Sequence, residues 1–504
     1  MKQMRRACAA GLFAGAMLTG CAVGPDFREP SAPAAGTYTE TPLPPQTVAA
    51  PGTAGGEAQR LLPGRDLPAE WWTLFRSEPL DSLIRAALGD SPNLAAAQAT
   101  LRQAREQYVA GTGQLLFPQV DANVGATREK VSGAELGSPS LGTTIFSLYN
   151  ASVNVSYTLD VFGRNQRELE GLQSQVDYQG FQLEGAYLTL TSNIVTAAVR
   201  EASLRGQIRA TQDIIASEQK VLDLTKRQRE LGAVAGLAVY AQGTQVAQFR
   251  ATLPPLEREL ARTRHELAVL AGRLPSEAAL PTFELDALTL PQDVPVSLPS
   301  SLVRQRPDIR AAEALWHRAS ADVGVATANL YPQITLTGAF GAQTTQFANL
   351  LAGPSVWSIG AALLQPVFHG GALTAQRRAA IAAYDAAGAQ YRETVLQAFQ
   401  QVADALRALD DDARTLQAQA EAERLAAATL NLTERQLQLG AVNYLALLVA
   451  QRQYELARIA LVQAQAARYA DTAALFQALG GGWWNRPDAD AAALNATGGA
   501  ISRE

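Results

Sequence analysis

The chain has 504 residues, which is enough for two or three ordinary domains. Its formal net charge is −5, so it lacks the excess of Lys and Arg that marks nucleic-acid binders. Hydrophobic residues make up 47% of the chain. Even so, no run of about 20 apolar residues follows the N-terminus, and this excludes a conventional transmembrane helix.

Residues 1–20 have the composition of a secretory signal peptide. Basic residues lie at Lys2, Arg5 and Arg6, and a short apolar segment covers 7–18. Cys21 follows the sequence Leu-Thr-Gly, an arrangement that resembles the bacterial lipobox, in which the Cys thiol is acylated and becomes the first residue. A multiply acylated Cys21 would anchor firmly, since each buried CH₂ contributes about 0.8 kcal/mol. Ala22 after the cysteine is compatible with sorting to the outer membrane.

Residues 21–63 are rich in Pro, Ala, Thr and Gly and have little periodicity. This composition predicts an extended leader between the lipid anchor and the folded body. A short amphipathic helix is expected to begin the folded part around Trp71–Ile84.

The rest of the chain contains an internal repeat. Pro92 and Pro307 each open a predicted helix of about 24 residues, because proline loses nothing in the first helical turn. Phe117-Pro118-Gln119 and Tyr331-Pro332-Gln333 then stop these helices and begin strands. We place the first repeat at 64–274 and the second at 301–484, joined by a Pro-punctuated linker at 275–300, with a disordered tail at 485–504.

Each repeat carries two stretches in which apolar and polar residues alternate. They predict strands at about 117–127, 146–159, 332–341 and 356–365. Strands of about 9–11 residues with one apolar face are typical of transmembrane β-barrels, although a soluble sheet shows the same alternation. Four strands are too few to close a barrel, since the smallest known have about eight. If these strands span a membrane, chains must therefore combine, and the pattern by itself does not choose between two and three copies.

A very long helix follows the second strand of each repeat, at about 165–231 and 372–439. At 1.5 Å per residue each helix is roughly 100 Å long. Apolar residues recur every three or four positions, which is coiled-coil spacing. Each long helix ends in the sequence Leu-Gly-Ala-Val, after which the chain should reverse into a helix of about 35 residues. Pro254-Pro255 predicts a kink or break in the first return helix.

The sequence offers no candidate catalytic or metal site. His265, His317 and His369 are far apart in the sequence, and each is interpreted as a surface or turn residue. No glycine-rich phosphate loop precedes a helix. We therefore expect neither enzyme activity nor a cofactor, apart from the covalent lipid on Cys21.

Together, the lipobox followed by Ala-Val-Gly-Pro-Asp-Phe, the Trp71-Trp72 segment, the two helix–Pro–strand junctions and the duplicated Leu-Gly-Ala-Val turns resemble one family. It is the outer-membrane factor family of tripartite efflux pumps, the TolC-type channels, in its NodT-like lipoprotein branch. The resemblance implies a mixed α and β membrane protein with an internal tandem repeat. Its fold would be a shared trimeric transmembrane β-barrel, four strands per chain, on a long periplasmic α-helical barrel.

The resemblance also implies a function and partners. The protein would be a passive homotrimeric channel in the outer membrane, carrying drugs or other small toxic compounds. A periplasmic adaptor protein would dock on the helical tips. An inner-membrane pump, of the resistance-nodulation-division class, would supply the energy and select the cargo.

In this family the periplasmic tip is the gate. The positions of this sequence that match it are Gly232, Ala233, Val234, Gly440, Ala441, Val442, Asn443, Tyr444 and Leu445, flanked by Arg227, Arg435 and Arg452. Family members often carry an Asp where this chain has Val449, and an acid where it has Ala238. A hydrophobic closure by Leu445 and its neighbours is therefore favoured over an acidic ring.

Two other functions fit the same patterns. A channel of this shape also serves protein secretion driven by an ABC-type pump. A trimeric surface lipoprotein without a pore would likewise need an anchor and long helices, although not alternating strands with a polar inner face.

Overall fold

The computed structural model describes residues 22–132, 142–277, 279–350 and 354–486. The described chain forms two compact units, each assembled from several segments. The first contains residues 22–30, 100–179 and 312–391, and the second contains 31–99, 180–311 and 392–486. Cys21, the expected signal peptide and most of the expected tail lie outside the described residues.

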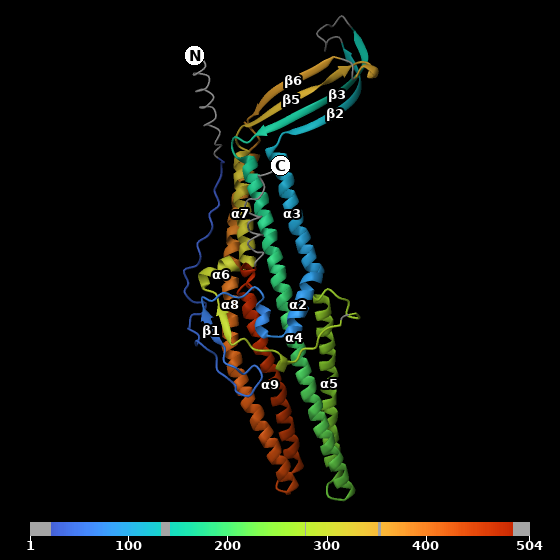
Figure 1. The fold of residues 1–504 in the computed structure, drawn as a ribbon, viewed down its shortest axis with the longest axis vertical. Coiled ribbons are helices and arrows are strands. Elements are labelled where there is room, and N and C mark those ends of the chain that lie inside the picture. Colours follow the sequence, from blue (N-terminus) through green and yellow to red (C-terminus); the bar gives the residue numbers. More distant parts are fainter. Residues whose placement is uncertain (1–21, 133–141, 278, 351–353, 487–504) are drawn as a thin grey trace. The chain divides into compact units, whose positions relative to one another are not determined.

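The first unit is built around an antiparallel four-stranded sheet (Figure 1). Its strands are β2 (Gln119–Ser132), β3 (Thr143–Leu159), β5 (Gln333–Thr344) and β6 (Ser355–Leu364), in the order β2-β3-β5-β6. β3 pairs with β5 from Tyr149 opposite Thr344 to Leu159 opposite Ile334, and this pairing joins the two repeats. β2 and β6 are the edges of the sheet.

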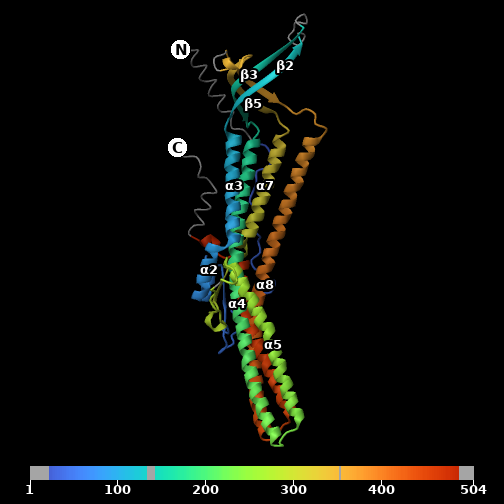
Figure 2. The ribbon, with the colours of Figure 1, turned by 90° about the vertical axis from the view of Figure 1, so that its right-hand side faces the viewer.

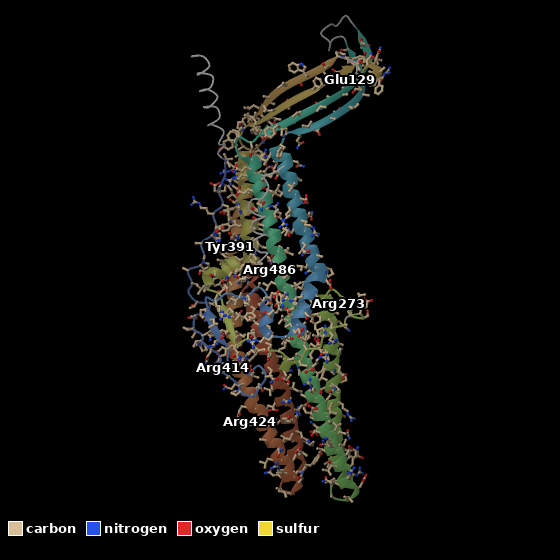
Figure 3. All side chains as sticks on the ribbon, viewed as in Figure 1. Glu129, Arg273, Tyr391, Arg414, Arg424 and Arg486 are labelled. Atoms are coloured by element: carbon tan, nitrogen blue, oxygen red, sulfur yellow. The ribbon has the colours of Figure 1, made fainter. Side chains whose placement is uncertain are left out.

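Two of the strands are longer than their alternating sequence suggests. β2 extends to Ser132, beyond the expected end at 127, and β3 begins at Thr143, before the expected start at 146. The additional part of β2 includes Arg128, Glu129 and Lys130, which pair with residues 145–147 of β3. Glu129 lies at the end of the sheet away from the helices (Figure 3). Backbone pairing across a hairpin continues through charged residues, so the hydrophobic pattern underestimates the strand length.

The first unit also holds parts of four helices: α3 (Pro92–Leu116), α4 (Arg164–Glu230), α7 (Pro307–Ala328) and α8 (Ala372–Gln438). Figure 2 shows these helices side by side near the sheet. Pro118 and Pro332 stand just beyond the ends of α3 and α7, where the missing N–H and the fixed backbone angle stop a helix. The first strand of each repeat begins at the next residue.

The second unit contains two helical hairpins. α4 turns into α5 (Gly236–Leu270), and α8 turns into α9 (Tyr444–Ala478). Both long helices have 67 residues and both return helices have 35. The apolar stripe of α4 faces inward, with Leu190, Ile194 and Ala197 buried. The opposite faces are solvated: Arg414 and Arg424 on α8 form ion pairs only with acids on their own helix (Figure 3).

The expected break at Pro254-Pro255 is absent, because α5 continues through both prolines. Both prolines are exposed, so the backbone carbonyls that lose their helical partners can bind water. The Thr252 hydroxyl also donates to the carbonyl of Phe249 at 2.8 Å and supports the preceding turn.

The second unit also holds a group of short elements, called here the belt. β1 (Arg60–Pro63) pairs in parallel with β4 (Asp293–Val296), so the end of the leader and the linker between the repeats form one sheet. The short helices η1 (Trp71–Phe75), α2 (Glu78–Asp90), η3 (Leu285–Ala287), α6 (Pro299–Gln305) and η5 (Trp483–Asn485) complete it. The last residues of the leader therefore form a strand that is hydrogen-bonded to the linker.

Arg468 of α9 holds this part of the leader in place. Its side chain is fully buried and donates to the carbonyls of Gly55 at 2.7 Å and Glu57 at 3.0 Å. It also donates to the Thr47 hydroxyl at 3.2 Å and to Gln59 Oε1 at 3.0 Å. These four bonds use the N–H groups of Nη1 and Nη2, while Nε has no hydrogen-bond partner among the described residues. They offset much of the cost of burying the guanidinium and fix the path of residues 47–59.

None of the helices in the described part of the chain combines the length and the apolar character needed to cross a membrane.

Candidate functional site

The two tip turns share one backbone design. Gly232 has φ 72° and Gly440 has φ 73°, a left-handed conformation that favours glycine. The amide of Gly232 donates to the carbonyl of Arg229 at 2.9 Å, and the amide of Ala233 donates to that of Gln228 at 2.8 Å. Gly440 and Ala441 make the same two bonds to Leu437 and Gln436, at 3.0 and 2.8 Å. Both turns are therefore Schellman motifs, which satisfy the last carbonyls of the long helices.

The return helices start differently. Asn443 caps α9, since its side-chain Oδ1 accepts the amide of Ala446 at 3.0 Å. Ala235 stands at the same place before α5 and makes no side-chain cap. A polar cap stabilises a helix start by about 1 kcal/mol relative to alanine, so α9 has the better-defined first turn.

Polar side chains connect the two hairpins just above the turns. The Tyr444 hydroxyl at the start of α9 donates to Gln242 Oε1 of α5, and it lies 3.5 Å from the Thr225 hydroxyl of α4. Gln242 Nε2 then donates to the carboxylate of Glu218 on α4 at 2.5 Å. Glu218, Thr225 and Gln242 are each at most 3% exposed. We call Glu218, Thr225, Gln242 and Tyr444 the tip interlock.

The interlock places a buried carboxyl among other acids. Burial raises the pKa of Glu218 to about 7, against the hydrogen bond from Gln242, and repulsion from Glu434 and Glu455 adds to the increase. Burial also raises the pKa of Glu455 to about 7, against the attraction of Arg452. No basic side chain makes a described hydrogen bond or ion pair with Glu218, so only the hydrogen bond from Gln242 offsets its negative charge when it ionises.

The structure places the sequence-predicted tip residues in two environments. Gly232, Ala233, Gly440, Ala441, Leu445 and Arg452 are exposed, whereas Val234, Val442 and Tyr444 are half-buried. Leu445 is 66% exposed and Val449 54% exposed in the single chain. Arg227 and Arg435 are exposed in the last turns of α4 and α8. Only Tyr444 of this set belongs to the interlock.

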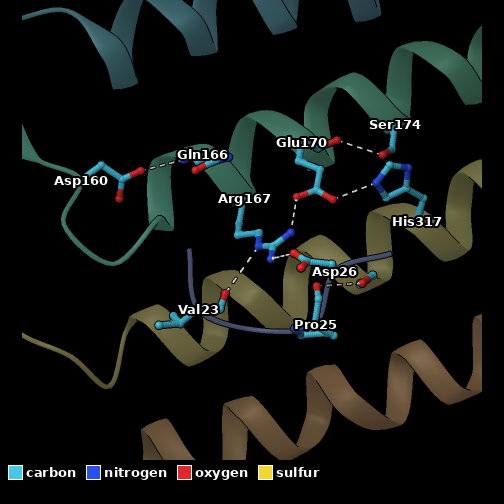
Figure 4. A network of polar contacts seen from close by, with 10 residues as sticks. Val23, Pro25, Asp26, Asp160, Gln166, Arg167, Glu170, Ser174 and His317 are labelled. Carbon is cyan, nitrogen blue, oxygen red and sulfur yellow. Dashed lines mark hydrogen bonds and ion pairs between the residues drawn. The ribbon is translucent and has the colours of Figure 1, made fainter. Parts of the chain in front are cut away.

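A second site, in the first unit, holds the start of the leader (Figure 4). Arg167 of α4 is buried and pairs with Asp26 at 2.6 Å and with Glu170 at 2.7 Å. Its Nε also donates to the carbonyl of Val23 at 3.4 Å. Glu170 Oε1 in turn lies 2.8 Å from His317 Nε2 of α7. Burial alone would favour the neutral acid, but hydrogen bonds from His317 and Arg167 hold the pKa of Glu170 below its usual value.

We call this site, formed by Arg167, Glu170 and His317 around residues 23–27, the leader seat. Apolar contacts complete it. The Phe27 ring stacks on His317 at 4.5 Å and meets Trp316 edge-on at 5.6 Å. Gly24 approaches Gly324 so closely that a Cβ on Gly24 would lie 2.5 Å from the Cα of Gly324. The seat therefore fixes the segment directly after Cys21, while Cys21 itself lies outside the described residues.

Sequence reasoning missed both networks. His317 is neither in a turn nor on the open surface, because Phe27 and Glu170 cover it within α7. Arg167, Glu218 and Gln242 look like ordinary polar positions on long helices. The one available signal was the Gly-Pro-Asp-Phe sequence after Cys21, since rare residue types in a low-complexity leader suggest a specific contact.

The described ranges offer no site for metal chemistry. Within them, no three His, Cys, Asp or Glu residues come close enough to hold an ion. His265 and His369 are both exposed. The chemistry of the tips and of the leader seat is that of hydrogen bonds and charge pairs, suited to holding and releasing segments of chain.

Comparisons with known proteins agree with this architecture. The outer membrane efflux protein family model matches residues 83–273 and 298–481. The chain is 32% identical to the pyoverdine export outer membrane protein OpmQ of Pseudomonas aeruginosa, over 82% of this chain and 87% of that protein. It is 29% identical to the toluene efflux pump outer membrane protein TtgC of Pseudomonas putida, over 93% and 94%. The solved outer-membrane channel OprN superposes with a TM-score of 0.80 at 27% identity, covering 92% of this chain and 100% of that one.

Proposed function

The chain belongs to the outer membrane efflux protein family, and we propose that it is a lipid-anchored exit duct for drugs or other small toxic compounds. Members of this family are channels in the outer membrane, not enzymes, and form part of efflux pumps. To this we add the anchor at Cys21, the class of cargo and the class of pump.

One observation carries the proposal. The four-stranded sheet ends in two edges, β2 and β6, and neither pairs with another strand of the described chain. Inside a lipid bilayer each unpaired backbone group costs several kcal/mol, so strands that span a membrane must close into a ring. Three copies supply 12 strands, since each contributes the four of one sheet. The channels of this family are trimers, and we assign the same assembly to this chain.

A passive duct has no energy source of its own, so transport through it requires partner proteins. Because the chain is a channel and not an enzyme, an inner-membrane pump has to drive transport. We infer a pump of the resistance-nodulation-division class and a periplasmic adaptor that docks on the two tip hairpins. The relatives are named for cargo as different as pyoverdine and toluene. We therefore assign the choice of cargo to the pump.

We place the gate at the tips. Leu445 and Val449 are exposed on α9 of the single chain, and Ala238 on α5 occupies a position where an acid would give an acidic ring. The interlock ties α9 to α4 and α5 at Tyr444, so it would resist opening of the tip. We infer a hydrophobic closure by Leu445 and its counterparts in the other copies.

Planar-bilayer recording on the purified trimer, combined with drug-susceptibility tests, examines this proposal. The full-length protein should give stable single-channel conductance and should restore drug resistance to a strain that lacks its own duct but retains a matching adaptor and pump. Cys21→Ala should abolish incorporation of labelled palmitate. A surface lipoprotein without a pore would give no conductance. A duct for protein secretion would conduct but would leave drug resistance unrestored.

A further inference from the structure

The helices near the sheet lie in the same order as the strands. α3 meets α4, where Asn165 Nδ2 donates to the carbonyl of Leu115 at 2.9 Å. α4 meets α7 at the Glu170–His317 pair. α7 meets α8, where the rings of Trp316 and Tyr391 stack at 5.6 Å. The helix order α3-α4-α7-α8 thus repeats the strand order β2-β3-β5-β6 (Figure 2).

The two repeats meet in the middle of this order, and an aromatic pair marks the junction. Phe162 follows β3 of the first repeat, and Tyr331 precedes β5 of the second. Their rings stack with centroids 4.8 Å apart and planes at 21°. The contact lies at the boundary between the sheet and the helices, where each strand is connected to its helix.

Each repeat has a second aromatic residue at a strand–helix junction, and these two residues adjoin the edge strands β2 and β6. Phe117 precedes β2 as Tyr331 precedes β5, each followed by Pro-Gln. Phe368 follows β6 as Phe162 follows β3, each preceded by Val. Phe117 is 60% exposed and Phe368 is 86% exposed. Phe117 and Phe368 therefore correspond to the two rings of the Tyr331–Phe162 pair, but neither stacks on another ring within the described residues.

The elements around these two rings are also exposed. Every residue of β6 is exposed, whereas the central strands β3 and β5 contain many half-buried residues. On the helices, α7 buries Ala321, Val323 and Ala328, while most of α3 and of the first turns of α8 remains open. A second copy with its α3 and β2 beside α8 and β6 would cover these surfaces as α7 and β5 cover α4 and β3.

We propose that Phe368 of one copy stacks on Phe117 of the next copy, reproducing between chains the Phe162–Tyr331 contact within a chain. This inference rests on the proposed trimer and names the contact that joins its subunits at the level of the sheet–helix boundary. A trimer would then carry a ring of six aromatic pairs, three within chains and three between them. Gly370 and Gly371, with φ 58° and 82°, provide the turn that brings the chain from Phe368 into α8.

Cysteine cross-linking in the outer membrane tests the proposal. The double variant Phe117→Cys with Phe368→Cys is made in the full-length protein, whose only other mature cysteine is the anchor candidate Cys21. A short bis-maleimide should convert it to covalent dimers and trimers, and neither single variant should cross-link. Phe162→Cys with Tyr331→Cys is the matched positive control and should link only within a chain. Phe117→Cys with Phe347→Cys, an exposed position in the loop between β5 and β6, should not link.

Photo-cross-linking covers the case in which the cysteine variants fail to assemble. Benzoylphenylalanine at position 368 retains an aromatic ring, and its adduct should map to the peptide containing Phe117 of another copy. Trimers on a native gel without either cross-link, or adducts only with lipid, would overturn the aromatic contact and leave the duct function intact. Monomers alone on the native gel would instead contradict the proposed trimer.

Discussion

Replacing Glu218 by Gln should remove a pH-dependent weakness of the tip. The pKa of this buried carboxyl is raised from 4.5 to about 7, so ionisation is less favourable in the packed hairpins than in the open chain. The packed hairpins favour the neutral carboxyl, and this stabilisation is complete below about pH 4.5 and is lost as the pH rises through 7. A pKa of about 7 in place of 4.5 corresponds to about 3 kcal/mol, because a tenfold change in the ionisation constant is about 1.36 kcal/mol.

The change is close to isosteric and keeps the network intact. A Gln at position 218 has a carbonyl oxygen that can still accept from Gln242 Nε2, while its amide carries no charge at any pH. At pH 5 the variant should match the natural protein. At pH 8 it should hold the interlock more tightly, by up to about 3 kcal/mol, or a factor of roughly 300 in local opening.

Hydrogen–deuterium exchange of the trimer in detergent or nanodiscs measures this opening. After correction for intrinsic exchange, peptides covering 210–225 and 238–250 should lose protection between pH 5 and pH 8 in the natural protein and much less in Glu218→Gln. Glu257→Gln, an exposed position on α5, is the matched control and should behave like the natural protein. An equal loss of protection in Glu218→Gln and the natural protein would refute the assignment of the weakness to this carboxyl.

Three further substitutions examine other parts of the structure. Tyr444→Phe removes the hydroxyl that bonds Gln242 and should raise passage of large antibiotics through the channel alone, whereas Tyr240→Phe, an exposed ring on α5, should not. Leu445→Ser should enlarge the closed-state leak in planar bilayers, and unchanged conductance would argue against a hydrophobic closure. Arg468→Met should destabilise the belt by about 1–3 kcal/mol for each buried acceptor that loses its donor, and should expose residues 47–59 to protease. Exposed Arg424→Met should leave the stability unchanged, and protease resistance in both variants would contradict the role of Arg468.

Several features of the fold follow from local rules and could be predicted from the sequence. Pro118 and Pro332 stop helices because proline lacks an amide hydrogen, and the strands do begin directly after them. Gly232 and Gly440 end the long helices because a left-handed turn favours glycine, and both form the expected reversal. The repeat itself predicted that these features occur in pairs. At Pro254 the prediction was a kink or a break, and the continuous helix excludes the break.

Long-range contacts could not be predicted in this way. Asp26 and Arg167 form an ion pair across 141 positions of sequence, and Tyr444 and Gln242 bond across 202. Apart from the Gly-Pro-Asp-Phe sequence that contains Asp26, nothing in their immediate neighbours distinguishes these side chains from solvated ones. Their roles come from burial, because a polar group removed from water must find a partner, and only the folded chain shows which partner is within reach.

The spacing of prolines, glycines and apolar residues therefore predicts the family and the internal repeat. These residues act on the conformation of the few residues around them. The pKa of Glu218, the contacts of Arg468 and the leader seat were decided only by tertiary packing. Desolvation and hydrogen bonding depend on neighbours in space, and these neighbours come from segments hundreds of residues apart.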